Sequence, residues 1–204
     1  MNPINTVSKI YHLTTPEELS TLLDSELTKL YFKCFAEPPS NQDNSVDKIK
    51  AMFSRHYESG GLILVANQDN RTVGFCATVP FPKSSLFSAE AVTATNQTVI
   101  SDDNFCRQHL NIEAGAAWYL ADIGTDSEYR GQGIATELFK TTLSLLPAGT
   151  PIFLRVTQAK TNAIRLYQSW GFKLLGLSQY PLYKKLSGQM EVESKFIMLY
   201  ENKK

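Results

Sequence analysis

The chain has 204 residues, of which 43% are apolar, 11% aromatic and 20% charged, a composition that excludes a disordered, collagenous or disulfide-rich protein. Its 20 basic and 20 acidic residues cancel, so no net field attracts nucleic acid or an anionic membrane, and any anion site has to be local. Because the N-terminus lacks the apolar core of a targeting signal and no apolar run is long enough to cross a membrane, we expect one cytoplasmic domain over residues 1–204.

The N-terminal part of the chain predicts a short strand followed by two helices. Residues 7–13 are β-prone, and Thr-Pro-Glu-Glu at 15–18 is typical of a helix start, with an N-cap, a proline at the first helical position and early acids. Apolar residues recur at helical spacing from there to Tyr31, so we expect one helix over this stretch. A second amphipathic helix is predicted at 46–57, and a pair of glycines ends it.

A hairpin and a long polar segment come next. Residues 62–66 and 72–79 are β-prone runs joined by a polar turn, which predicts a β-hairpin. Residues 82–114 are polar and poorly periodic, apart from Ser-Asp-Asp at 101–103, which is typical of the cap of a short helix. A stretch of this length inside one domain is typical of an insertion with its own role or of a mobile loop.

The second half of the chain alternates strands with helices. We expect strands at 118–125, 151–157, 172–177 and 195–200, and helices at 133–146 and 160–170. Such alternation predicts an α/β layer with a partly parallel centre, in which ligands bind at the carboxyl ends of strands.

The sequence EYRGQGIAT, residues 128–136, joins an expected strand to an expected helix. A glycine-rich turn at a helix start directs several backbone N–H groups outward and can hold a phosphate. A P-loop lacks support here, because its Gly-Lys-Ser/Thr ending is missing. A Rossmann turn also lacks support, because Thr136 replaces its third glycine and Arg155 and Val156 stand where its acid belongs. An ordinary turn with a solvated arginine is the remaining alternative to a phosphate site.

The same turn contains Arg-x-x-Gly-x-Ala at 130–135, which resembles the pyrophosphate-binding signature of the GNAT superfamily of acyl-CoA-dependent N-acetyltransferases. YLADIGTDSEYRGQGIATELF resembles the central block of that superfamily, TNAIRLYQSWGF its next helix, and FIMLY its closing strand. The resemblance covers nearly the whole chain, with its specific motifs at 118–172. It implies an α/β fold with a central mixed sheet of about six to seven strands flanked by helices, and a polar insertion at about 82–114 that is longer than the usual connection.

The resemblance also implies an acetyl-CoA site without a metal. The strand before the turn carries a bulge in the family, and its backbone pairs with the pantetheine arm, here through Ile123 and Thr125. The pyrophosphate would rest on the turn and on the first residues of the helix, with Arg130 supplying a charge. The cofactor-binding residues that we expect are Ile123, Thr125, Arg130, Gly131, Gln132, Gly133, Ile134, Ala135, Thr136, Lys160 and Asn162. Lys160 stands where many relatives have an asparagine, and Asn162 follows two places later.

Two residues are candidates for proton transfer. Tyr167 falls where many family members place a tyrosine that protonates the cofactor sulfur, and the alternative is a tyrosine packed on the core. Asp122 is the candidate base, acting directly or through water, because Ala121 replaces the glutamate of the spermidine/spermine acetyltransferases. A structural aspartate, or an amine that arrives deprotonated, would require no base. Arg155 stands where relatives that acetylate protein N-termini often have an acid, which argues against that acceptor unless Arg155 is only a solvated strand residue.

The function implied is transfer of an acetyl group from acetyl-CoA to a primary amine by direct attack in a ternary complex. The acceptor, a small-molecule amine or a peptide or protein amine, is left open, and so is a homodimer; specificity should lie in residues 28–55 and in the insertion. Neither nucleic acid nor a membrane is an expected partner. One alternative is a non-catalytic acyl-CoA-binding module, which the missing acid at Ala121 favours, and another is an unrelated nucleotide-binding α/β protein.

Cysteines and histidines give no sign of a metal or a disulfide framework. No Cys-x-x-Cys pair is present, so we expect reduced thiols at Cys34, Cys76 and Cys106. The histidines lack the spacing of a metal site or a catalytic triad, so we expect structural or surface roles for His12, His56 and His109.

Overall fold

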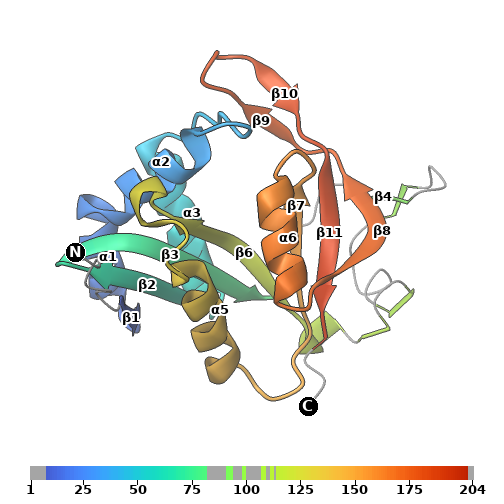
Figure 1. Cartoon of the computed structure of the whole chain (residues 1–204), viewed down its shortest axis with the longest axis horizontal. Coiled ribbons are helices and arrows are strands. Elements are labelled where there is room, and N and C mark those ends of the chain that lie inside the picture. The colour runs from blue at the N-terminus through green and yellow to red at the C-terminus, as the bar shows by residue number, and fades with distance from the viewer. Residues whose placement is uncertain are drawn as a thin grey trace, which may run out of the picture. The chain divides into compact units, whose positions relative to one another are not determined.

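The helices and strands fall into two groups, each of which packs within itself. In the computed structural model, residues 8–81, 91–93, 98–99, 107–108, 111–112 and 114–201 are described. The first unit comprises residues 1–36, 44–78 and 122–146, and the second comprises 37–43, 79–121 and 147–204. Figure 1 labels helices and strands of both units.

The elements have the following bounds: β1 Lys9–His12, α1 Pro16–Ser25, α2 Leu27–Ala36, α3 Val46–Glu58, β2 Leu62–Gln68, β3 Arg71–Pro80, β4 Ala91–Thr93, β5 Thr98–Val99, η2 Ala114–Ala116, β6 Trp118–Thr125, η3 Ser127–Tyr129, α5 Ile134–Leu145, β7 Ile152–Thr157, α6 Thr161–Ser169, β8 Lys173–Gln179, β9 Leu182–Lys184, β10 Met190–Val192 and β11 Lys195–Tyr200.

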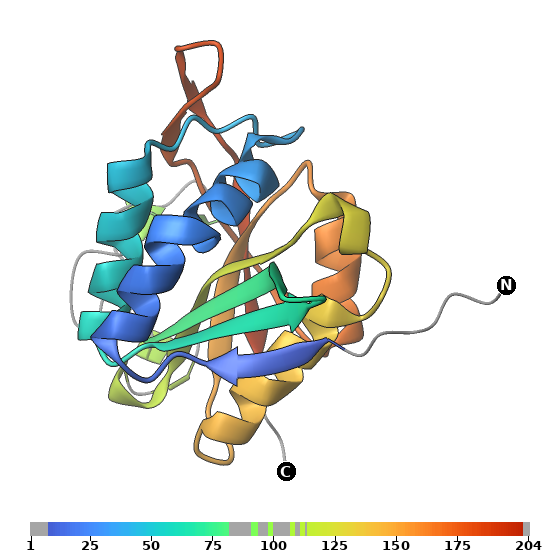
Figure 2. The same cartoon turned by 90° about the vertical axis from the view of Figure 1, so that its left-hand side faces the viewer.

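The first unit is a small antiparallel sheet with helices on both faces. β2 pairs with β1 on one side and with β3 on the other. The side chains of neighbouring strand residues point to opposite faces, and a Cβ on Gly74 would lie 2.8 Å from Ile134 of α5. Phe75 instead packs among the buried residues of α1, α2 and α3, which include Phe53. Figure 2 shows α5 on one side of these strands and the other three helices on the opposite side.

The first predicted helix is in fact two helices, α1 and α2, so the expectation of one helix to Tyr31 was wrong. Glu26 interrupts the run: its backbone N–H closes α1 on Leu22, and its carboxylate accepts a 2.7 Å hydrogen bond from the Thr72 N–H. Ser25 also turns its hydroxyl back to the Thr21 carbonyl, at 2.8 Å. The Ser25 bond gives a helix carbonyl a side-chain partner, and the Thr72 bond holds the Glu26 side chain against β3, at a point where the apolar spacing is unbroken.

The predicted hairpin is present, and the ring of Phe75 on its second strand packs against the backbone of Gly124 on β6. The hairpin turn is confirmed, with Asp69 and Asn70 both at positive φ, as a tight turn between twisted strands requires. On β6, a Cβ at Gly124 would lie 2.6 Å from the Phe75 ring and 3.0 Å from Cys34 Sγ. Glycine is therefore needed at 124 for space, because no side chain fits between these groups.

The second unit contains a mixed sheet, which confirms the predicted α/β class. Residues 118–120 of β6 run parallel to β7, whereas β11 runs antiparallel to both β7 and β8. β4 pairs with β8 and with β5, so two strands of the insertion add to those expected from the alternating pattern. One face buries an apolar cluster, comprising Val79, Phe81, Ala117, Tyr119, Phe153, Leu177, Ile197 and Leu199. The short helix expected from 101–103 lies outside the described residues.

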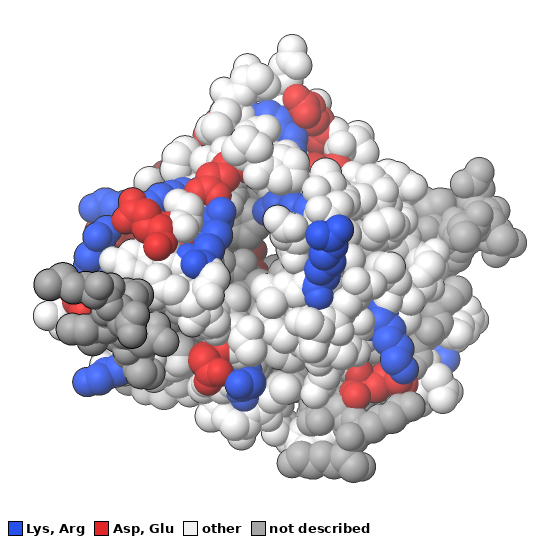
Figure 3. Space-filling model, viewed as in Figure 1, with Lys and Arg blue, Asp and Glu red and all other residues white. Residues whose placement is uncertain are grey.

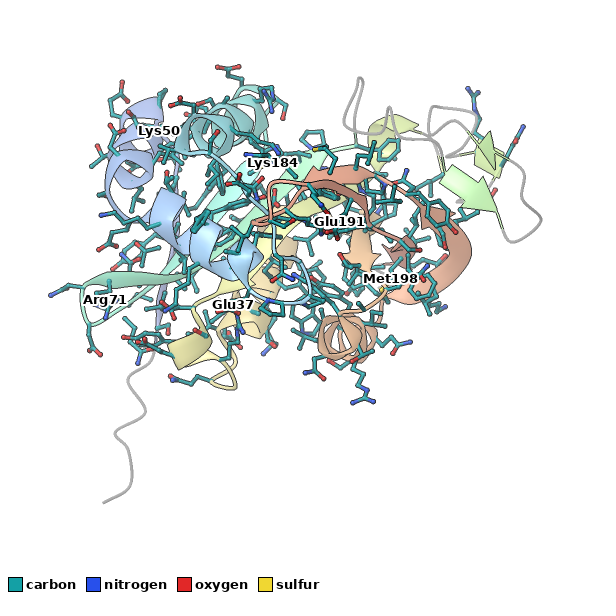
Figure 4. All side chains as sticks on the ribbon, turned by 90° about the horizontal axis from the view of Figure 1, so that it is seen from above. Glu37, Lys50, Arg71, Lys184, Glu191 and Met198 are labelled. Atoms are coloured by element: carbon teal, nitrogen blue, oxygen red, sulfur yellow. The ribbon has the colours of Figure 1, made fainter. Side chains whose placement is uncertain are left out.

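The hairpin formed by β9 and β10 was not predicted. It carries Lys184 and Glu191, which are labelled in Figure 4. Its strands are three residues each, too short for a clear alternation in the sequence. Residues 37–43 pair with it: the Asp43 N–H donates to the Lys184 carbonyl and the Leu186 N–H to the Asn41 carbonyl, both at 2.8 Å.

Beneath this hairpin, Glu193 is the centre of a buried polar cluster. Its carboxylate lies 2.6 Å from Lys185 Nζ and 3.5 Å from Lys195 Nζ. It also accepts hydrogen bonds from Gln42, at 3.0 Å, and from the Thr157 hydroxyl, at 2.9 Å. The charge of Glu193 is therefore compensated within the second unit.

Among the described helices, none combines the length and apolarity that a membrane span requires.

Candidate active site

β6 lies next to β3 in the sheet, and between two hydrogen bonds that join these strands β6 contains one more residue than β3. The Phe81 N–H donates to the Ala117 carbonyl, and further along the Asp126 N–H donates to the Val73 carbonyl. Between these bonds the chain advances eight residues from Val73 to Phe81 and nine from Ala117 to Asp126. An extra residue of this kind is a β-bulge, which bends the strand and redirects its side chains.

The end of β6 is tied down by Asp126. Its side chain accepts the Glu128 N–H at 3.1 Å and so caps the short turn η3, and it lies 2.6 Å from Lys33 Nζ of α2. Burial by itself raises the pKa of Asp126, but the Lys33 ammonium and the Glu128 N–H outweigh burial and lower that pKa below its ordinary value. Asp126 is therefore a carboxylate that holds the start of the turn.

Residues 130–133 form an exposed turn that leads into α5, whose first residue, Ile134, is buried. Gly131 and Gly133 have φ of +79° and +83°, and a Cβ on either would meet nothing within 4 Å. Glycine is thus favoured by backbone conformation and not by lack of space. No side chain caps α5, whose N-cap residue is Gly133. The N–H groups and the positive dipole end of a helix of this kind attract an anion.

One further feature of this turn is consistent with a bound phosphate ester. Arg130 is exposed, and its Nε donates to the Thr125 carbonyl at 3.2 Å, which holds the guanidinium at the turn. Thr125 Oγ1 is buried and has no hydrogen-bond partner within the described part of the chain. The N–H groups at the start of α5 and the Arg130 guanidinium suit an anionic ligand.

Asp122 lies on β6, within the span that contains the extra residue, and contacts two helices of the first unit. Tyr31 of α2 donates its hydroxyl to Asp122 Oδ1 at 3.1 Å, and His56 Nε2 of α3 lies 3.3 Å from Asp122 Oδ2. The side chains of His56 and Asp122 are 3% and 11% exposed. His56 was expected to be structural or on the surface; it is buried and paired with a candidate base, which no spacing in the sequence indicated.

The remaining predicted residues lie in the second unit. Tyr167 is half-buried on α6, with its ring 5.4 Å from that of Trp170 and 6.0 Å from that of Phe172. Lys160 is the N-cap residue of α6 but makes no side-chain capping bond, and Asn162 is exposed in the first turn. The roles of Tyr167, Lys160 and Asn162 stay predictions.

Arg155 is not a solvated strand residue. It is partly buried on β7, where its Nε donates to the Tyr119 hydroxyl and its Nη1 to Gln179 Oε1, each at 3.0 Å. Its guanidinium carbon also lies 5.8 Å from the centre of the Tyr119 ring. The guanidinium therefore takes part in the packing of the second unit.

Two of the three cysteines lie in the part of the chain that the structure describes. Cys34 and Cys76 are outside any disulfide, and burial raises the pKa of Cys76 to about 11, which disfavours its reactive thiolate. His109 and Cys106 lie outside the described residues. Across the described ranges, no cluster of acidic, histidine or cysteine side chains could hold a metal. On the face drawn in Figure 3, positive and negative side chains are interspersed.

A family model described as "Acetyltransferase (GNAT) family" matches residues 23–172. Among solved structures, the ribosomal-protein-S18-alanine N-acetyltransferase of Escherichia coli shares 18% identity with a TM-score of 0.58, covering 97% of this chain and 96% of its own. An N-acetyltransferase of Staphylococcus aureus Mu50 shares 15% with a TM-score of 0.62, covering 97% and 99%. The yncA protein of Salmonella typhimurium, whose structure contains acetyl-CoA, shares 12% with a TM-score of 0.60, covering 97% and 95%. No curated protein matches the sequence significantly.

Proposed function

Because the chain belongs to the acetyltransferase (GNAT) family, we propose that it transfers an acetyl group from acetyl-CoA to a primary amine by direct attack in a ternary complex. The observation that supports this most directly is the exposed turn at 130–133, where two left-handed glycines precede a helix without a side-chain cap. This turn suits the pyrophosphate of coenzyme A, and Arg130 adds a positive charge.

The cofactor would be held by the residues predicted from the sequence. The N–H groups from Gly131 to Thr136 bind the pyrophosphate, and the β6 backbone at Ile123 and Thr125 binds the pantetheine arm as an added strand would. Lys160 and Asn162 are the proposed contacts from α6. Acetyl-CoA, when bound, supplies the acetyl group as a thioester.

Two side chains of the protein would move protons. Asp122 accepts a proton from the acceptor ammonium, which frees the nitrogen lone pair that forms the new N–C bond. Tyr167 donates its hydroxyl proton to the sulfur as the C–S bond breaks. The second proton lost by the nitrogen restores the Tyr167 hydroxyl through water, and Asp122 releases its proton to solvent, so the step is balanced.

The acceptor is best sought with a panel of amines and thiol release as the readout. The panel should contain polyamines, lysine peptides and peptides with a free N-terminal alanine, because one structural relative is a ribosomal-protein-alanine N-acetyltransferase. Thiol release that depends on one class of amine is expected. Release that is the same with and without every amine would contradict amine acetylation.

The turn is tested by Gly133→Asp, which places a carboxylate among the N–H groups. We expect the affinity for coenzyme A to fall at least about tenfold by calorimetry, because an anion would be repelled. Gly149→Asp is the matched control, since Gly149 has a similar φ of +81° and similarly open space but follows α5. Equal affinities for coenzyme A in the two variants would show that the turn does not bind the pyrophosphate.

A non-catalytic acyl-CoA-binding module is the second candidate, favoured by Ala121 at the position where some relatives carry an acid. The amine panel separates the two candidates. Once an acceptor is known, Tyr167→Phe tests the acid, because loss of a general acid typically lowers kcat by about 10²–10⁴. An unchanged rate would remove the acid role of Tyr167. Coenzyme A binding without transfer to any amine would favour the module, and thermal stabilisation by nucleotide but not by coenzyme A would contradict both.

A further inference from the structure

Three elements of the first unit converge on the carboxylate of Asp122. Tyr31 comes from α2, His56 from α3 and Asp122 from β6, and the two contacts join residues 91 and 66 positions apart in the chain. Each oxygen of the carboxylate has its own partner, because Tyr31 approaches Oδ1 and His56 approaches Oδ2. Such a pair of bonds at two different oxygens defines the plane of the carboxylate.

The surroundings of Asp122 restrict its rotation without filling its capacity as a proton acceptor. A carboxylate has about four lone-pair sites, of which these two bonds use two. Tyr31 is fixed in turn by aromatic packing, since its ring stacks on Phe35 at 4.5 Å and meets Phe53 edge-on at 5.7 Å. His56 is 3% exposed, at the C-terminal end of α3. Both partners are therefore rigidly placed.

Neither partner needs a charge to bind the carboxylate. A tyrosine hydroxyl is a neutral donor, and an imidazole donates through Nε2–H in its neutral form as in its protonated form. The Cys76 thiol of β3 contacts Thr142 of α5 on the opposite face of the strands, and the Asp122 charge contributes to its raised pKa. An anion that is 11% exposed and held by such donors attracts a cation such as an ammonium group.

We propose that His56 and Tyr31 are positioning residues for proton transfer, orienting Asp122 toward an acceptor that arrives as an ammonium ion. This inference rests on the proposed function. In the reaction, the nitrogen-to-hydrogen bond of the ammonium breaks and the proton forms a bond to an oxygen of Asp122. His56 keeps its Nε2 proton throughout, so its contribution is orientation and not proton transfer.

The test compares variants that remove the bond with one that keeps it. His56→Leu removes the donor, whereas His56→Gln retains an N–H near the position of Nε2. With the best amine of the panel, we expect His56→Leu to lower kcat about 10- to 100-fold with an unchanged KM for acetyl-CoA, and His56→Gln to keep most of the activity. Tyr31→Phe keeps the aromatic stack and should lower kcat by less. His12→Leu, a histidine of β1, is the control and should leave kcat unchanged.

A second measurement does not depend on activity or on an acceptor. The ring nitrogens of the three histidines are observed by ¹⁵N NMR, with His56 assigned from the His56→Gln spectrum. We expect the His56 Nε2 to carry a proton in the unsubstituted protein, and its resonance to shift in Asp122→Asn while that of His12 does not. An Nε2 without a proton, or no shift, would overturn the proposal even if His56→Leu does not fold.

Activity and spectra together distinguish failure of the positioning role from failure of the proposed function. Unchanged kcat in both His56→Leu and Tyr31→Phe, or equal losses in His56→Leu and His56→Gln, would overturn the positioning role and leave amine acetylation standing. Absence of transfer to any amine in the unsubstituted protein would overturn the proposed function. In that case the NMR result decides whether the His56–Asp122 bond exists.

Discussion

Asp122 in the first unit and Glu193 in the second are both carboxylates with little exposure, at 11% and 6% of the side chain, and their partners differ. Glu193 is bound by two lysines, a glutamine and a threonine. Asp122 is bound by a tyrosine and a histidine. The Glu193 carboxylate is thus paired with two lysine ammonium groups, whereas the two bonds to Asp122 leave lone pairs for a ligand. The difference suggests that Glu193 serves stability and Asp122 serves chemistry.

Replacing each carboxylate by its amide should give opposite results, and this is the largest effect that we expect. Asp122→Asn should lower kcat about 10²–10⁴-fold, because the amide cannot accept the amine proton, with little change in the unfolding midpoint. Glu193→Gln should lower the unfolding midpoint and leave the rate of the folded fraction nearly unchanged. The measurements are thiol release and urea denaturation. A rate loss in Glu193→Gln comparable to that in Asp122→Asn would contradict the assignment of Glu193 to stability and of Asp122 to chemistry.

Removing a cation from the Glu193 cluster should give the next largest effect. Lys185→Met leaves a buried carboxylate short of its nearest cation and should cost about 3–5 kcal/mol of unfolding free energy at pH 7. Burial by itself raises the pKa of Glu193, but Lys185 and the other donors outweigh burial and lower it. The stabilisation is therefore present above the unfolded carboxyl pKa and is lost as pH falls through the folded pKa.

Denaturation of Lys185→Met at several pH values checks this sign. The difference from the unsubstituted protein should be full at neutral pH and should shrink in acid, because a protonated Glu193 needs no cation. The double variant Lys185→Met with Glu193→Leu should recover part of the loss, since both charges are then absent. A penalty that stays constant into acid would show that Lys185 contributes through packing and not through charge.

A third carboxylate, Asp126, is paired with one lysine, and loss of that lysine should give the smallest of the three effects. Its cation Lys33 is 41% exposed, so solvent screens the pair. We expect Lys33→Met to lower the melting temperature less than Lys185→Met does, and the loss to shrink both in high salt and in acid. The acid dependence follows because the pKa of Asp126 is lowered, so its stabilisation disappears as it protonates. Calorimetry in low and high salt measures this, and a loss that salt does not change would place the pair among the buried ones.

The glycine-arginine turn before α5 was predictable because its conformation depends on adjacent residues. Gly131 and Gly133 adopt the positive φ that glycine allows, and the apolar spacing after them forms α5. The α/β alternation and the hairpin turn at Asp69 and Asn70 were predictable for the same reason. The break at Glu26 was not, because the hydrogen bond that stabilises it comes from Thr72, 46 positions away.

By itself the sequence determined the α/β fold and the glycine-arginine turn, since each depends on short-range backbone preference, whereas the choice of Asp122 as the candidate base came from the resemblance to the acetyltransferases. Tertiary structure alone decided which side chains bind each carboxylate. His56 and Tyr31 reach Asp122 only because α2 and α3 pack on the same face of the strands, and Lys185 reaches Glu193 only because β9 and β10 fold back on each other. Hydrogen bonds between distant segments follow from packing, and no local pattern encodes them.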